Sequence, residues 1–312
     1  MSLRQKLRLL LASTRVANLP SVVSNVWLGV ALSVYSLPSD TGRIWPPALQ
    51  LSLAGILLYV SGNLFNDWHD RHWDLVHRPE RALPQGAFPP LLYLGLATLC
   101  VLTGVTLAGL AGTGSGLVAV LIVTSIVIYT RWHKQSAWAV LLMGLCRALL
   151  PLLFFCQGSP AWMGAGMSGM AHIAPAMLAI LFYICGLSLL ARGESSGLVS
   201  NKTRLAAWSM MVLAGLLMAT ITMFQGPLLA LLGLLPFCFW LATCSKGDCL
   251  QPARRVAALL AGIPLLDWVI LLPISLGMMG HGRVDPTALT CLLLPPLACL
   301  SGRCLQRLAP AT

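Results

Sequence analysis

The sequence predicts an all-α protein, a polytopic bundle of nine to ten transmembrane helices. Of its 312 residues, 57% are hydrophobic and only 9% are charged, whereas soluble domains carry roughly 25% charged residues. Apolar stretches close to the roughly 20 residues needed to cross a bilayer recur along the whole chain. Too few polar side chains remain to cover a surface that faces water, which excludes a globular, disordered or disulfide-framed protein.

The apolar stretches divide the chain into three parts. Residues 1–16 form a cytoplasmic amphipathic lead-in, because a basic start without a cleavage-site pattern runs through Leu9, Leu10 and Leu11 into the first stretch. Residues 17–302 form the transmembrane domain, and residues 303–312 form a cytoplasmic tail. The ten candidate spans lie at 17–37, 46–65, 88–110, 115–130, 137–156, 172–191, 205–223, 226–243, 256–277 and 286–302.

The charges predict the orientation of the chain. Lys and Arg number 20 against 9 Asp and Glu, a net charge of +11. With the N-terminus in the cytoplasm, Arg43 and Arg283 are the basic residues that fall in outside segments, and Arg147 falls within a span. This distribution follows the positive-inside rule. It favours a multi-pass protein of a plasma membrane, such as a bacterial inner membrane, and it argues against nucleic acid as a partner.

An acidic cluster follows the second apolar stretch. Asp67, Asp70 and Asp74 stand at i, i+3 and i+7, and Asn66 precedes Asp70 by four positions. If the second helix continues through Asp74, these groups share one face at its cytoplasmic end. Like charges at the edge of a low-dielectric region, near a helix C-terminus, are destabilising unless a cation joins them. Mg2+ that carries a phosphate ligand is the natural complement.

Three arginines stand within this cluster or directly after it. Arg71, Arg78 and Arg81 supply the planar donors that suit phosphate oxygens. A simpler interpretation is a solvated charged loop that only fixes the topology. Arginines alone would orient the chain, however, so the acidic residues favour a ligand site.

These residues resemble a known motif. The pattern Asn66-Asp67-x-x-Asp70-x-x-x-Asp74, followed by Arg81-Ala-Leu-Pro-Gln-Gly86, resembles the first aspartate-rich motif of the UbiA superfamily of intramembrane prenyltransferases. The resemblance implies an all-helical fold with a central cavity open to the cytoplasmic side. It further implies that Mg2+ bridges the motif to a polyprenyl diphosphate, whose prenyl group is transferred to an acceptor within the membrane, with Asp67, Asp70 and Asp74 as the catalytic residues.

Other segments extend the resemblance. Tyr129-Thr-Arg-Trp-His-Lys134 resembles the Tyr…Lys segment after the fourth helix, and Lys202-Thr203 resembles the pair that opens the seventh helix. The second acidic motif of the superfamily is reduced here to Glu194, which is expected to complete the metal ligands Asn66, Asp67, Asp70 and Asp74. The expected diphosphate-binding residues are Asn66, Arg71, Arg78, Arg81, Tyr129, Arg131, Lys134, Arg147 and Lys202.

The stretches Arg192–Ser195 and Gly144–Arg147 resemble a divergent subgroup, the UbiA-like EboC group.

Two ionisable residues fall inside predicted spans, Arg147 in the fifth and Asp267 in the ninth. A lone charge at the bilayer centre costs roughly 2.5–3.5 kcal/mol, so both side chains should face the interior of the bundle. Two interpretations stay open. Arg147 pairs with Asp267, or it meets the diphosphate.

Three other functions are alternatives to prenyl transfer. A CDP-alcohol phosphotransferase requires an Asp-Gly pair and a distal Asp-x-x-x-Asp, which the sequence lacks. A membrane hydroxylase would use His69, His72 and His77 as iron ligands, yet the other histidines are widely spaced. A transporter or catalytically idle lipid-binding protein on the same scaffold is compatible with the single Glu194. The apolar spans imply membrane lipid as a partner, and the resemblance implies a polyprenyl diphosphate. The acceptor and the oligomeric state stay open.

Overall fold

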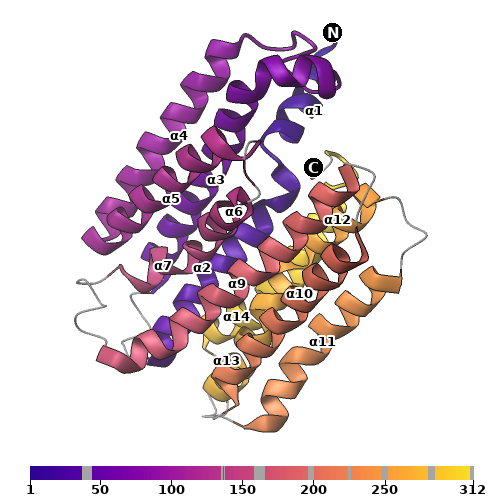
Figure 1. Cartoon of the computed structure of the whole chain (residues 1–312). Coiled ribbons are helices and arrows are strands. Elements are labelled where there is room, and N and C mark those ends of the chain that lie inside the picture. Colours follow the sequence, from indigo (N-terminus) through magenta and orange to yellow (C-terminus); the bar gives the residue numbers. More distant parts are fainter. Residues whose placement is uncertain are drawn as a thin grey trace.

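A computed structural model describes residues 1–36, 44–134, 136, 138–157, 166–195, 200–223, 226–246, 252–279 and 285–309. All regular secondary structure in these ranges is helical, which confirms the expected all-α bundle (Figure 1). The helices of the N-terminal half are α1 (Leu3–Ser13), the 3-10 turn η1 (Val16–Asn18), α2 (Leu19–Ser36), α3 (Trp45–His77), α4 (Pro90–Ala111), α5 (Thr113–Trp132), α6 (Ala139–Ala148) and α7 (Leu150–Phe155). Those of the C-terminal half are α9 (Gly166–Ser195), α10 (Asn201–Thr222), α11 (Pro227–Lys246), α12 (Pro252–Ala261), α13 (Ile263–Met279) and α14 (Pro286–Leu305).

The described helices make the chain a multi-pass integral membrane protein. Within the described ranges, 9 helical segments are long and apolar enough to cross a bilayer. A further apolar segment, Ala139–Phe155, is shorter. Nine long spans and one short segment agree with the nine to ten crossings expected from the sequence.

The short segment differs from the continuous span expected at 137–156. It is divided into α6 and α7, and Pro151 stands in the first turn of α7. Because proline has no backbone N–H and clashes with the preceding turn, it interrupts a helix at about this position. The Ser115 hydroxyl of α5 donates to the Leu153 carbonyl at 2.6 Å and ties α7 to its neighbour.

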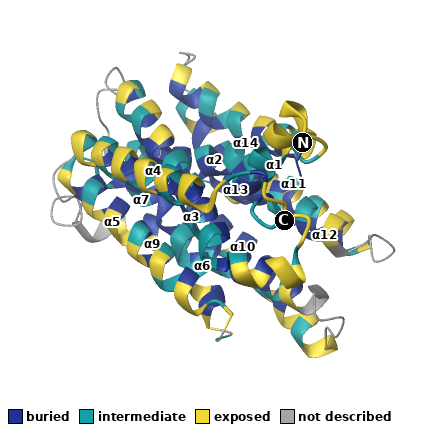
Figure 2. Cartoon of the chain, turned by 90° about the horizontal axis from the view of Figure 1, so that it is seen from above, coloured by how far each residue is buried: buried dark blue, intermediate teal, exposed yellow. Residues whose placement is uncertain are grey.

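Helices α2 and α13 lie at the centre of the bundle, and α4 and α11 lie at its periphery (Figure 2). Helix α2 contacts α3, α7, α9, α13 and α14. Its contact with α7 is close, because a Cβ built on Gly29 would lie 2.0 Å from the Pro151 carbonyl oxygen. Only glycine fits where two backbones approach so closely.

Both ends of the chain reach the same end of the bundle. Gly302 near the end of α14 packs against the Ala17 carbonyl of η1, which directly follows the N-terminal helix. Figure 1 shows α1 and the end of the chain on this side. Both ends lie on one side of a membrane only when the number of crossings is even. The described residues contain nine long spans, so the α6–α7 segment counts as a further crossing.

Candidate diphosphate and metal site

The acidic cluster lies on the final turns of α3. This helix has 33 residues and is therefore roughly 50 Å long, longer than the roughly 30 Å of bilayer hydrocarbon. It continues through His77, as the spacing of the aspartates required. Asp67, Asp70 and Asp74 are all buried, with exposed fractions of 6%, 4% and 1%. The three carboxylates thus share one inward face of the helix.

Arg81 neutralises two of these carboxylates. Its Nη1 atom lies 3.2 Å from Asp67 Oδ1 and 2.8 Å from Asp74 Oδ2. Burial alone would lower the pKa of Arg81, but the nearby charges of Asp67 and Asp74 hold that pKa above its ordinary value. The guanidinium is therefore a permanent cation between the first and last aspartates.

Asp70 receives its positive partners from the end of α5. Lys134 Nζ lies 2.7 Å from Asp70 Oδ1, and His133 Nε2 lies 3.1 Å from Asp70 Oδ2. Within α3, His69 Nδ1 lies 3.3 Å from Asp70 Oδ1. Tyr129 stacks on the His133 ring, with centroids 5.0 Å apart. The expected Tyr129 and Lys134 thus lie at the site, together with a histidine that sequence reasoning did not assign to it.

The segment between α1 and α2 also reaches the cluster. The Ser13 hydroxyl accepts a hydrogen bond from the Tyr93 hydroxyl at 2.9 Å, and Ser13 and Arg15 lie close enough to Asp67 to act on its charge. Arg15 adopts the left-handed conformation, with φ 49° and ψ 48°, and its Nη1 donates to Asn63 Oδ1 at 2.9 Å. Non-glycine residues in this region cost energy and concentrate at functional sites. Sequence reasoning missed these contacts, since it treated Arg15 as a topology signal.

Several expected diphosphate ligands lie elsewhere in this structure. Arg71 donates to the Trp68 carbonyl at 2.8 Å and lies over the Trp68 ring. Arg78 forms the C-cap of α3 and is partly buried. Arg131 and Lys202 are exposed, on α5 and on the first turn of α10. Among the expected cations, Arg81 and Lys134 form ion pairs with the aspartates in the described part of the chain.

The C-terminal end of α9 lies beside the α5 segment. The Arg192 guanidinium donates to the carbonyl of His133 and, at 3.2 Å, to that of Ser136. Two residues further along α9 stands Glu194, the expected fifth metal ligand. Its side chain lies outside the described residues.

Arg147 lies deeper in the bundle, on α6. It donates to the Ser21 hydroxyl of α2 and lies over the Tyr59 ring, with its guanidinium carbon 5.4 Å from the ring centroid. Asp267 of α13 instead accepts from Ser24 at 2.6 Å and from Asn25 at 2.9 Å. The two ionisable side chains therefore both bond to polar side chains of α2, but to different ones. No direct ion pair between them occurs among the described contacts.

The α3 face suits a hard divalent cation. Asn66 Oδ1 and Asp74 Oδ1 are buried oxygen atoms without a hydrogen-bond donor in the described part of the chain. Oxygen atoms of this kind are the ligands that Mg2+ prefers. In this arrangement, however, the carboxylates are turned toward Arg81 and Lys134. No group of three Asp, Glu, His or Cys side chains in the described ranges surrounds a single ion position.

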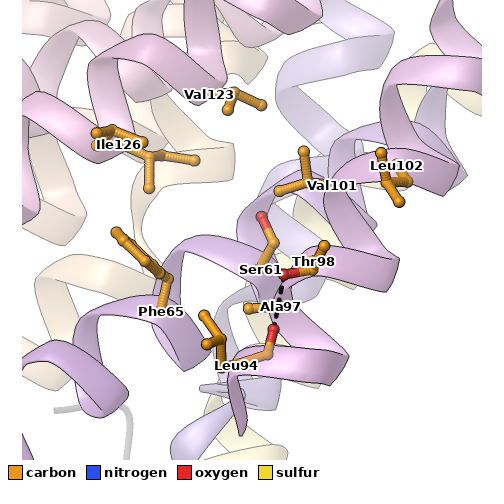
Figure 3. A pocket seen from close by; sticks show the side chains of 10 residues that line it. Ser61, Phe65, Leu94, Ala97, Thr98, Val101, Leu102, Val123 and Ile126 are labelled. Atoms are coloured by element: carbon orange, nitrogen blue, oxygen red, sulfur yellow. Dashed lines mark hydrogen bonds between the residues drawn. The ribbon is translucent and has the colours of Figure 1, made fainter. Parts of the chain in front are cut away.

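A small apolar pocket lies on the opposite face of α3. It encloses about 170 Å³ and is lined by Ser61 and Phe65 of α3 together with side chains of α4 and α5, such as Leu94 and Ile126 (Figure 3). At 100° per residue, Ser61 and Phe65 point away from the aspartate face. The pocket is therefore separate from the carboxylate site.

The described fold agrees with comparisons to known proteins. A sequence pattern that represents the UbiA prenyltransferase family matches residues 22–244, more than half of the chain. A search of curated proteins found no match. A solved digeranylgeranylglyceryl phosphate synthase superimposes with a TM-score of 0.58 at 18% identity, over 86% of this chain and 99% of that one. An apo UbiA homologue from Aeropyrum pernix K1 gives a TM-score of 0.51 at 13% identity, over 92% and 98% of the two chains. The structural similarities establish a common fold, and the sequence match shows that the chain belongs to the UbiA prenyltransferase family.

Proposed function

We propose that the protein transfers a prenyl group from an allylic polyprenyl diphosphate to an acceptor within the membrane, with Mg2+ as cofactor. The observation that carries this proposal is the buried row of Asp67, Asp70 and Asp74, approached by cations from outside α3. Family membership supports prenyl transfer in general. The proposal places the site and the N-terminus on the cytoplasmic side.

The residues of this chain would hold both charged components. Asn66 and the three aspartates would bind Mg2+ through oxygen atoms, and the metal would stabilise negative charge on the diphosphate. The carbon–oxygen bond of the allylic diphosphate breaks heterolytically, so its electron pair leaves with the diphosphate. Arg81 and Lys134 carry the fixed positive charges that stabilise this leaving group.

The ion pairs of Arg81 and Lys134 suggest how the site is loaded. Both side chains neutralise the aspartates. If a divalent cation took over the carboxylates, these two side chains would become available to phosphate oxygens. The two cations offset most of the charge of the three aspartates, so a buried acidic cluster is tolerated.

Glu194 is proposed as a further Mg2+ ligand. Support comes from Arg192, which attaches this end of α9 to the His133 segment beside Asp70. E194Q should therefore weaken Mg2+-dependent diphosphate binding. The assignment to the EboC group stays a prediction.

The test uses D67N and D70N in the full-length purified protein. Calorimetry with a prenyl diphosphate and Mg2+ should show binding to wild type and loss of binding in both variants, and EDTA should abolish binding to wild type. D285N is the matched control, because Asp285 caps α14 through its side chain and asparagine caps helices equally well.

Persistence of Mg2+-dependent binding in D67N and D70N would sink the assignment of the site. Binding by wild type without release of diphosphate, in the presence of membrane extracts that supply acceptors, would indicate the catalytically idle lipid-binding protein instead.

A further inference from the structure

Helix α1 lies outside the bundle and leaves part of its surface uncovered. It contacts α3 and η1. Its last turns pack on the protein, where Leu9 and Leu10 lie against a small cluster that includes Tyr93 and Leu64. Residues 1–8 are all exposed. The first two turns of a regular, capped helix are therefore largely uncovered by the rest of the protein.

This uncovered part has one apolar face. Leu3, Leu7 and Leu10 follow one another at i, i+4 and i+7, so they form a single row. Leu10 packs on the protein, whereas Leu3 and Leu7 have exposed fractions of 85% and 55%. The row is covered by protein at Leu10 and exposed at Leu3 and Leu7. An exposed apolar row of this kind indicates a binding surface.

Cations flank this row on both sides. At 100° per residue, Arg4 and Lys6 project on opposite sides of the leucines, and Arg8 follows Arg4 by one turn. No acidic residue precedes Asp40 in the sequence, and the first turn of α1 contains none. The surface is therefore apolar in its centre and positive at its edges.

The position of α1 identifies the partner that matches this surface. Helix α1 leads through η1 directly into the first span, Val16–Ser36. It therefore lies at the level where a bilayer presents its headgroups. Two exposed tryptophans border the connection between α5 and α6. Trp132 ends α5 with an exposed fraction of 52%, and Trp138 precedes α6 with an exposed fraction of 76%. Tryptophan is enriched at the membrane interface.

We propose that α1 docks on the membrane surface by binding anionic phospholipid headgroups through Arg4, Lys6 and Arg8, with Leu3 and Leu7 inserted among the acyl chains. Amphipathic helices with a basic border bind such surfaces through apolar burial and charge attraction together. The inference is independent of prenyl transfer. It connects the lipid surface to the carboxylate cluster, because Thr14 and Arg15, directly after α1, bond to Asn63, one turn before Asp67 on α3.

Hydrogen exchange of the full-length protein tests this proposal. The protein is reconstituted in nanodiscs of phosphatidylcholine alone or mixed with phosphatidylglycerol, and exchange of the amides of residues 3–12 is measured by mass spectrometry. We expect slower exchange in the anionic nanodiscs by roughly tenfold or more, since each basic residue near an anionic surface contributes about fivefold. The η1 amides are the internal control, because Arg15 at the N-cap of η1 and Asn18 within it bond to Asn63 and Tyr59 of α3.

The triple variant R4Q/K6Q/R8Q should lose the difference between the two lipids. The matched variant R204Q/R254Q/R307Q removes the same charge from other exposed positions and should retain the difference. L3Q/L7Q should exchange faster in both lipids. Equal exchange of wild-type α1 in the two lipids would overturn the proposal, as would protection that disappears on dilution of the protein, which would assign the face to a second copy of the chain.

Discussion

The ammonium group of Lys134, at the end of α5, lies 2.7 Å from the Asp70 carboxylate on α3. The same nitrogen lies 4.3 Å from the centroid of the Trp73 ring. A carboxylate and an aromatic face thus hold this cation beside the acidic cluster before any ligand arrives. The contact joins two helices that are far apart in sequence, and it brings a second strong donor to the cluster beside Arg81.

Replacement of Lys134 by methionine should weaken diphosphate binding. A hydrogen bond to a charged group contributes about 1.5–3 kcal/mol, so the Kd for a prenyl diphosphate with Mg2+ should rise about tenfold to hundredfold. Isothermal titration calorimetry measures this change. K246M is the control, since Lys246 is exposed at the end of α11. An unchanged Kd in K134M would remove Lys134 from the site.

Replacement of Arg81 by glutamine should destabilise the protein when Mg2+ is absent. Asp67 and Asp74 would lose their common cation, and the buried like charges would cost about 1–3 kcal/mol. Mg2+ should raise the Tm of R81Q more than that of wild type, because the metal no longer has to displace a guanidinium. Thermal unfolding followed by tryptophan fluorescence gives both values, with R204Q as a charge-matched control. Equal Mg2+ effects in R81Q and wild type would contradict the exchange of cations.

Replacement of Asp267 by asparagine should lower stability without changing the Kd for diphosphate. The new amide N–H would face donors from Ser24 and Asn25. Buried polar groups would then lack hydrogen-bond partners, which costs about 1–3 kcal/mol of stability. S275A is a matched control, because Ser275 is equally buried on α13 but bonds only to its own helix. The double variant R147Q/D267N tests whether the two side chains are coupled. If its loss in free energy of unfolding equals the sum of the losses in the two single variants, they are not coupled through α2.

Replacement of Gly29 by alanine should strongly destabilise the contact between α2 and α7. The added Cβ would lie 2.0 Å from the Pro151 oxygen, so the helices would have to separate. G95A is the control, because a Cβ at Gly95 meets no atom within 4 Å. Thermal unfolding should show a large decrease in Tm for G29A and almost none for G95A. Equal Tm values for G29A and wild type would mean that α7 can move away from α2 without a loss of stability.

The architecture could be predicted because it depends on local sequence. Runs of apolar residues with few charges define each long span, since the bilayer tolerates little else. The common face of Asp67, Asp70 and Asp74 followed from helical spacing. The interruption in 137–156 could also have been anticipated, because Pro151 is visible in the sequence. The apolar length of that segment alone predicts a continuous span.

The partners of the aspartates could not be predicted from spacing. His133 reaches Asp70 from the end of α5, and Arg15 reaches Asn63 of α3 from the turn after α1. No periodicity links such distant positions. Arg71 lies within the motif in sequence, directly after Asp70, yet its side chain points away from the aspartate face and donates to the Trp68 carbonyl. Neighbours in sequence are therefore poor indicators of which cation serves which carboxylate. The acceptor depends on the same kind of long-range assembly.

The divided crossing has a consequence for the surrounding lipid. Ala139–Phe155 comprises 17 residues, which rise roughly 25 Å against roughly 30 Å of hydrocarbon. This hydrophobic mismatch must be relieved by local thinning of the bilayer or by loops that enter it under the cover of neighbouring helices. At the end of α7 the cover exists, since the Gln157 carbonyl is pressed against Gly112 at the α4–α5 turn. At the start of α6, Trp138 stands exposed, so there the leaflet itself should dip toward the protein and bring headgroups closer to the carboxylates.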